Sequence, residues 1–460
     1  MRYDGQAGVR VTVRDLREYR TVVALAEEVT SCGGSGVGTF EVRMTGAALV
    51  ALAGAGVRHE VLVPDIQRHV DQIWADDAAI RAGGGVGGAA DDEAWFATYR
   101  SLAEIEARLA VLALDYPQLA TLSDIGPSIQ GRQLKMMRIT GPGSAAGRPA
   151  LLIHANQHAR EWVTPMCAMF IVDRLLETYA VDPRIRAVVD AFEWHIVPCV
   201  NPDGYEYSRT VNSQWRKNRR DNPGTTCDGV DLNRNWGYVW GYDNTGSSPN
   251  TCSDIYRGTG PFTEPEILPL RALSDSLSGQ GRLRVHIDIH SNARKILSPW
   301  AHTPVDPPAM PLMNTIAQKI QAGMQGVRGQ PYPYGQWAEN LYLSNGVAPD
   351  YSYGVHGVLG WTIEMSGNSF QPPVTEILPN AREALAGMLA LAEHFLPSAC
   401  YPNCDGSTTA PALNVADFSC FLGRYAAGEA WANCDSSTVP PVLNVADFSC
   451  FLTRYAAGCP

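Results

Sequence analysis

Residues 151–162 read Leu-Leu-Ile-His-Ala-Asn-Gln-His-Ala-Arg-Glu-Trp, an apolar run that gives way to His158 and Glu161. The run is short and follows Arg148-Pro149, which favours a buried strand over a helix. Both side chains would then follow a strand end, where open α/β sheets bind ligands. Imidazole nitrogen and carboxylate oxygen are common zinc ligands. Taken alone, however, a His-x-x-Glu pair is also typical of a capping glutamate beside a surface histidine.

A catalytic zinc commonly takes three protein ligands and leaves a fourth position open. The best candidate for the third ligand is His290, which ends the alternating segment 284–289 and is followed by the turn signal Ser291-Asn292. That alternation predicts a strand. We therefore expect one metal site where two strand ends meet.

Strand and helix patterns alternate through the middle of the chain. Strands are expected at 134–139, 150–153, 193–200 and 284–289, and helices at 102–114, 164–179 and 268–277. Such alternation predicts an α/β fold with a mixed, largely parallel sheet covered by helices on both faces. Cys167 and Cys199 lie in apolar contexts, where buried free thiols are expected.

Further motifs follow in a fixed order. They are Asn201-Pro-Asp-Gly-Tyr205, Trp215-Arg-Lys217, Gly229-Val-Asp-Leu-Asn-Arg-Asn-Trp236, Tyr342 and Thr362-Ile-Glu364. Together with His158-Ala-Arg-Glu161-Trp and His290-Ser291, they closely resemble the zinc metallocarboxypeptidases of the carboxypeptidase A/B type. The match covers about residues 95–395 and does not depend on one short motif.

The resemblance implies that His158, Glu161 and His290 bind zinc. It implies that Glu364 is the general base that activates the attacking water. By the same resemblance, Arg216 polarises the scissile carbonyl and holds the oxyanion. The resemblance also implies a clamp on the substrate's C-terminal carboxylate, formed by Asn233, Arg234 and Tyr342. It implies that Arg160 is a secondary substrate-binding residue and that Asp231 orients His158. It further implies a disulfide between Cys227 and Cys252.

The N-terminal residues 1–75 show a small β-α-β-(α)-β pattern, with helices expected at 16–29, 47–55 and 65–73. This α+β arrangement, ferredoxin-like in type, resembles the propeptide of the same carboxypeptidases, most closely at Val61-Leu-Val-Pro-Asp-Ile-Gln67. The resemblance implies a proenzyme, although an unrelated adaptor domain also fits the pattern. Residues 76–93 are rich in glycine and then acidic, which predicts a linker where a protease activates the enzyme. The catalytic domain is expected at 94–397.

The last segment, 398–460, contains a repeat of Asn-Cys-Asp, then Leu-Asn-Val-Ala-Asp-Phe-Ser-Cys-Phe-Leu. It resembles the duplicated Cys-rich loop-helix of dockerin-type modules, which bind calcium and a scaffold or cell-surface partner. Its ligand spacing departs from an EF-hand loop. Disulfide-stapled loops with capped helices are therefore an equal alternative. The implied calcium ligands are Asp405, Asn414, Asp417, Asp435, Asn444 and Asp447.

Composition restricts the function classes. The net charge is −11 and no face dense in Lys and Arg is visible, which argues against nucleic acid as a partner. No apolar run is long enough to cross a bilayer, and no signal peptide follows Met1.

The chain has eleven cysteines, and six of them lie between Cys400 and Cys459. This density indicates an oxidising compartment, so we expect a secreted or cell-surface protein.

We therefore expect a zinc carboxypeptidase that releases single C-terminal residues from peptides or proteins. Relatives that prefer basic residues carry an Asp where this chain has Pro349, and Ala301 and Trp337 occupy other pocket positions. The expected preference is for neutral, apolar or aromatic residues, unless a shift of one residue brings Asp350 into the pocket. A zinc peptidase of cell-wall peptides and a non-catalytic binding protein on the same fold are the alternatives.

Overall fold

The structure is a computed structural model that describes residues 1–30, 37–83, 93–143, 145, 147–365, 367–396, 402–405, 407, 413–429, 432–434 and 441–458. These residues belong to two compact units, Met1–His394 and Phe395–Pro460. Among the helices in these ranges, none is both long and apolar enough to cross a membrane.

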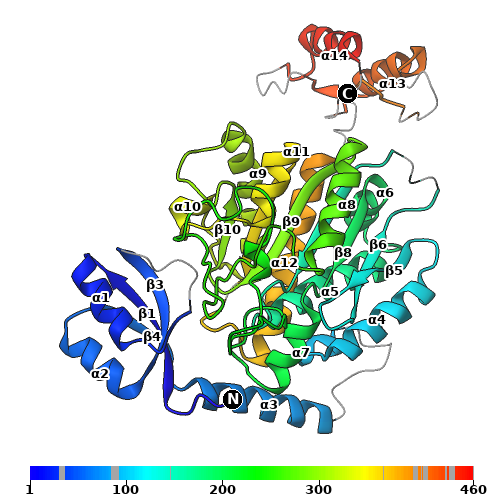
Figure 1. Ribbon diagram of the computed structural model, residues 1–460. Helices are drawn as coiled ribbons and strands as arrows, with labels where there is room; N and C mark the ends of the chain where they lie inside the picture. The colour runs from blue at the N-terminus through cyan, green and yellow to red at the C-terminus, as the bar shows by residue number, and fades with distance from the viewer. Residues whose placement is uncertain are drawn as a thin grey trace. The chain divides into compact units, whose positions relative to one another are not determined.

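The larger unit is built on an eight-stranded sheet in the order β11-β10-β12-β9-β7-β8-β6-β5. Figure 1 labels β10, β9, β8, β6 and β5 across this sheet. Its centre is parallel, because β9 pairs in parallel with both β12 and β7, and β7 pairs in parallel with β8. The antiparallel pairs are β5 with β6, β6 with β8, and β10 with β12. The expected mixed, largely parallel sheet is confirmed. Its strands are β5 Ala120–Pro127, β6 Gln133–Ile139, β7 Ala150–Ala155, β8 Glu193–Val197, β9 Leu283–Ser291, β10 Lys295–Ser298, β11 Tyr334–Gln336 and β12 Leu359–Met365.

Helices cover both faces of this sheet. Ala150 and Leu152 of β7 pack in one cluster with Leu277 of α8, and every residue of β7 is buried. Leu151 and Ile153 point to the opposite face, which α5 covers, because side chains alternate along a strand. The helices are α4 Leu102–Asp115, α5 Val163–Glu177, α6 Pro183–Ala191, α7 Pro202–Thr210, α8 Ile267–Gly279, α9 Met310–Arg328, α10 Trp337–Asn340, α11 Ala348–His356 and α12 Ile377–Phe395.

The N-terminal residues form a four-stranded antiparallel sheet in the order β2-β3-β1-β4. The helix expected at 16–29 is shorter: it begins after the capping Asp15, ends at Leu25, and gives way to a short strand that contains Glu28. The last helix runs to Ala82, so residues 76–82 of the expected linker are helical, and 84–92 lie outside the described residues. The elements are β1 Gln6–Val13, α1 Leu16–Leu25, β2 Glu28–Val29, β3 Gly38–Thr45, α2 Gly46–Gly54, β4 Arg58–Val63 and α3 Ile66–Ala82.

The C-terminal unit contains α13 (Val415–Ala426) and α14 (Val445–Ala457). Asn414 and Asn444 begin these helices, and each forms a capping box with the aspartate three residues later. Disulfides join Cys404 to Cys420 and Cys434 to Cys450. Stacked Phe421 and Phe451 fill the small core between the two copies. The described part of this unit therefore matches the expectation of stapled loops with capped helices.

The disulfide between Cys227 and Cys252 is also present in the larger unit. Cys167 and Cys199 are buried free thiols, as expected.

Replacing Cys227 and Cys252 together by serine should lower the free energy of unfolding by about 3 kcal/mol, because the bridge closes a loop with a sequence separation of 25. Thermal unfolding followed by circular dichroism would show a lower Tm for the double variant. A Tm equal to that of the oxidised wild type would contradict the structural role of the bridge.

Candidate metal centre and cavity

The carboxyl ends of three neighbouring strands meet at one edge of the sheet. β7 and β9 are parallel neighbours in which His154 lies opposite Asp288. β12 lies on the other side of β9 and places Glu364 opposite His290. The same edge of the sheet therefore holds the loop after β7 and the ends of β9 and β12, as expected for parallel strands.

The loop after β7 turns sharply to bring its side chains back to this edge. Asn156 adopts a positive φ of 63°, which asparagine tolerates better than most residues. Its side-chain amide donates to the backbone carbonyls of His158 and Glu161 at 3.1 and 3.4 Å. The turn thus fixes the backbone of both residues.

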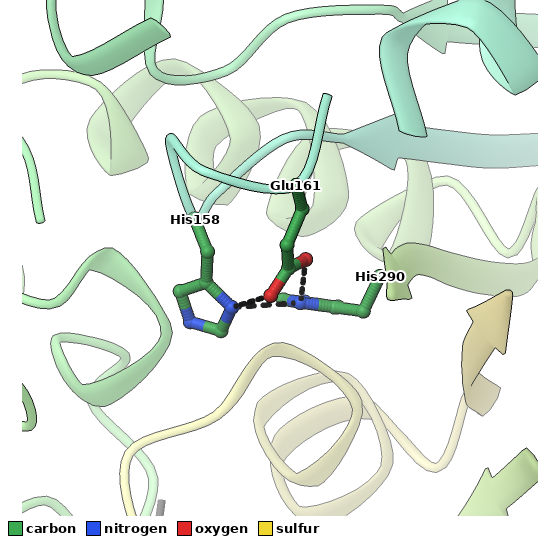
Figure 2. Close-up of side chains that lie close together, drawn as sticks. All are labelled: His158, Glu161 and His290. Carbon is green, nitrogen blue, oxygen red and sulfur yellow. Dashed lines mark hydrogen bonds and ion pairs between the residues drawn. The ribbon is translucent and has the colours of Figure 1, made fainter. Parts of the chain in front are cut away.

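Three buried side chains, His158, Glu161 and His290, converge there (Figure 2). Glu161 Oε1 lies 2.8 Å from His158 Nδ1, and its Oε2 lies 3.0 Å from His290 Nδ1. One ligand atom from each residue lies within 4.8 Å of the others. This arrangement suits a small ion that accepts two nitrogens and a carboxylate.

The other nitrogen of each imidazole contacts a buried carboxylate. His158 Nε2 lies 3.2 Å from Asp231 Oδ1, and His290 Nε2 lies 2.7 Å from Asp288 Oδ2. A proton held on Nε2 leaves Nδ1 with a lone pair aimed at the centre, which is how proteins orient histidine ligands of metals. The nitrogen and oxygen donors and their carboxylate partners therefore fit zinc.

Asp288 is a candidate functional residue that the sequence motifs did not indicate. The alternating segment 284–289 does place Asp288 on the same strand face as His290, because residues two apart in a strand share a face. His286, Asp288 and His290 thus lie on one side of β9. Gln157 Nε2 also donates to Asp288 at 2.6 Å, and His154 Nδ1 lies 3.2 Å from its other oxygen.

The buried charges shift one another's pKa values. Burial alone would raise the pKa of Glu161, but His158 and His290 lower it overall. Burial would likewise raise the pKa of Asp231, which Arg216 and His158 hold well below its usual range. Both carboxylates are therefore ionised at neutral pH, as a metal centre requires.

A cavity of about 780 Å³ opens over His158 and Glu161. Glu364, Arg216 and Tyr342 line it beside His158 and Glu161. Glu364 is buried, and its Oε2 has no hydrogen-bond partner among the described residues. Burial and the charge of Glu161 raise the pKa of Glu364 to about 7. Arg216 is held at the wall by bonds of 3.1 and 2.9 Å from its Nε and Nη2 to Asp231.

Asn233 and Arg234 belong to a short 3-10 turn, Leu232–Arg234, and do not line this cavity. Asn233 Nδ2 lies 3.2 Å from His290 Nε2, and the side-chain oxygen of Asn233 accepts from the backbone of Ala348. Arg234 is fully buried and donates to two backbone carbonyls. Its Nη2 has no partner among the described residues, so this guanidinium can still receive an anion.

Arg160 forms polar contacts with residues of the N-terminal sheet region. Its Nη2 donates to the carbonyl of Thr30 at 2.7 Å, and its Nη1 lies 3.5 Å from Glu28 and 3.1 Å from Asp254. Phe370 stacks on the guanidinium at 4.1 Å. Arg160 is thus covered rather than exposed to the cavity.

The positions considered for specificity also lie outside the cavity lining. Ala301 and Trp337 pack in a buried apolar cluster with Leu297 and Val347. Asp350 is buried and accepts from the backbone of Ala301 and from His302. These hydrogen bonds keep the Asp350 carboxylate at residues 301–302, so it does not face the cavity.

Comparisons with known proteins agree with this geometry. Residues 105–387 match the family model described as zinc carboxypeptidase. Zinc carboxypeptidase A 1 of Anopheles gambiae is 33% identical over 73% of this chain and 75% of its own length. Carboxypeptidase A1 of Bos taurus is 28% identical over 85% of this chain and 94% of its own. The crystal structure of carboxypeptidase A from Helicoverpa armigera superposes with a TM-score of 0.72, at 24% identity over 85% of this chain and 99% of that one.

Replacing Asp288 by asparagine should weaken zinc binding by about 10- to 100-fold, because His290 loses the carboxylate that orients it. Competition with a chromogenic chelator would measure the affinity. Asp275→Asn is the matched control, since Asp275 also accepts from a histidine, His356, but lies away from the centre. Equal affinities of wild type and Asp288→Asn would contradict the role of Asp288.

Proposed function

The chain belongs to the zinc carboxypeptidase family and is a metallocarboxypeptidase. We propose which of its residues bind the metal, catalyse the reaction and bind the substrate. It hydrolyses the C-terminal peptide bond of peptides, and the centre of His158, Glu161 and His290 is the proposed zinc site. The observation that carries the proposal is the convergence of these buried ligands under a cavity that Glu364 and Arg216 line.

A bound zinc ion supplies a Lewis acid that polarises a carbonyl and makes a coordinated water more acidic. Glu364 is the proposed general base, because its Oε2 has no hydrogen-bond partner within the described ranges and its raised pKa suits proton transfer near neutral pH. Arg216 stabilises negative charge that grows on the carbonyl oxygen. Asp231 keeps both His158 and Arg216 in position.

Arg234, Asn233 and Tyr342 are the proposed clamp for the substrate's free carboxylate. A planar guanidinium pairs with a carboxylate through two parallel hydrogen bonds. The Nη2 of Arg234, which has no hydrogen-bond partner in the part of the chain that the structure describes, supports this role. Arg160 is proposed as a secondary substrate contact once its present partners leave.

We further propose that residues 1–75 act as a propeptide and that a protease activates the enzyme within 76–93. Support comes from Arg160, which Thr30 and Glu28 cover, and from Thr39, Phe40 and Glu41, which line the cavity. Residues 94–397 would then be the catalytic domain, with Asp350 turned away from basic substrates. A preference for neutral, apolar or aromatic C-terminal residues stays a prediction.

Residues 398–460 are proposed as a dockerin-like module that binds a scaffold or cell-surface partner of a secreted enzyme. Calcium binding there stays a prediction. Asp417 already accepts from the backbone of Asp405 and Asn414 at 3.2 and 2.9 Å, which favours a capping role. Asp435 lies outside the described residues.

A peptide panel tests the proposed function. We expect chelator-sensitive release of single C-terminal residues that increases after limited proteolysis near residues 81–93. Glu364→Gln should retain zinc but lose at least about a hundredfold in rate, since general-base catalysis contributes that much. No release by metal-loaded, cleaved protein would favour the cell-wall peptidase or binding-protein alternatives.

The pH profile tests the role of Glu364. Burial raises its pKa from 4.5 to about 7, so the base form is lost as the pH falls through this range. The acidic limb of kcat/KM should have its midpoint between 4.5 and about 7. A profile with no acidic limb above pH 4.5 would contradict Glu364 as the base.

A further inference from the structure

Lys295 lines the same cavity as Glu364 and Tyr342. It is the first residue of β10, and the antiparallel register places it directly opposite Glu364. Its Nζ donates to the backbone carbonyl of Asn340, two residues before Tyr342. The ammonium group is therefore fixed between the proposed base and the proposed clamp.

This ammonium group has no close counterion in the described part of the chain. No carboxylate of the described residues lies within 4.0 Å of Lys295 Nζ. Burial lowers the pKa of Lys295, although the charge of Glu364 acts in the opposite direction. A half-buried lysine without an ion pair has lost hydration, and one backbone carbonyl does not neutralise its charge, so a bound anion would stabilise it.

The two arginines that line the cavity are already paired with carboxylates. Arg10 and Glu41 of the N-terminal sheet pair with each other at 2.9 Å. Arg216 is bound to Asp231, and Glu339 is exposed to solvent. Lys295 is thus the cavity cation for which no carboxylate partner is found among the described residues.

We propose that Lys295 determines specificity by pairing with the acidic side chain of a C-terminal glutamate or aspartate. This assignment depends on the proposed carboxypeptidase function and competes with the apolar preference expected from the sequence. The substrate's α-carboxylate has its own partner in Arg234, so the second cation is left for the side chain. Asp350 is occupied by Ala301 and His302, and it does not compete for this site.

Peptides that differ only in the last residue test the proposal with the full chain after limited proteolysis. The last residue is Glu, Gln, Phe or Lys. We expect kcat/KM for the Glu peptide to exceed that for the isosteric Gln peptide by about tenfold or more, the usual effect of a hydrogen bond to a charged group.

Three variants separate charge from packing. Lys295→Met should abolish the advantage of Glu while changing the Gln peptide by no more than about twofold. Lys295→Arg should keep the advantage, and Lys295→Glu should transfer it to the Lys peptide. Calorimetry on inactive Glu364→Gln should show tighter binding of the Glu peptide, and Lys295→Met added to that variant should remove the difference.

Equal rates for the Glu and Gln peptides with wild type would overturn the assignment. So would an equal loss for all four peptides in Lys295→Met, because Lys295 would then act on the shared carboxylate or on Glu364. Release of none of the peptides by wild type would instead overturn the proposed carboxypeptidase function.

Discussion

The site depends on the parallel pairing of β7, β9 and β12. Parallel neighbours end at the same edge, so the loop after β7, His290 and Glu364 are brought together without any contact between them in sequence. A shift of one residue in β9 would move His290 to the opposite face, because side chains alternate along a strand. The buried core on both faces of the sheet holds this register, and thereby the candidate metal centre.

Much of the fold and of the candidate metal centre could be predicted, because short sequence patterns indicate the strands and the residues that follow them. The apolar run before His158 and the alternation before His290 each predicted a strand, and the structure places both next to each other. β12 was not predicted, since Leu359–Met365 is a short apolar run without clear periodicity. Asp288 shares a strand face with His290, which the sequence does show, but its role was missed because sequence does not tell which carboxylate contacts each imidazole nitrogen.

The cavity wall could not be derived from sequence alone. Matching positions indicated Ala301, Trp337 and Pro349 as the specificity pocket, yet tertiary packing buries the first two in an apolar cluster. Lys295 lies in the cavity because the antiparallel register of β10 and β12 sets it opposite Glu364. Such a pairing depends on contacts distant in sequence, which local patterns do not contain. The engagement of Arg160 by Glu28 and Thr30 depends in the same way on packing of the N-terminal sheet.

The central claim is that His158, Glu161 and His290 form one zinc site. Anomalous diffraction collected on both sides of the zinc absorption edge tests it most directly. We predict one strong peak that appears only above the edge, within bonding distance of Nδ1 of His158, Nδ1 of His290 and a carboxylate oxygen of Glu161. A structure of zinc-loaded protein with no peak at this place, or with the peak on other side chains, would contradict the account.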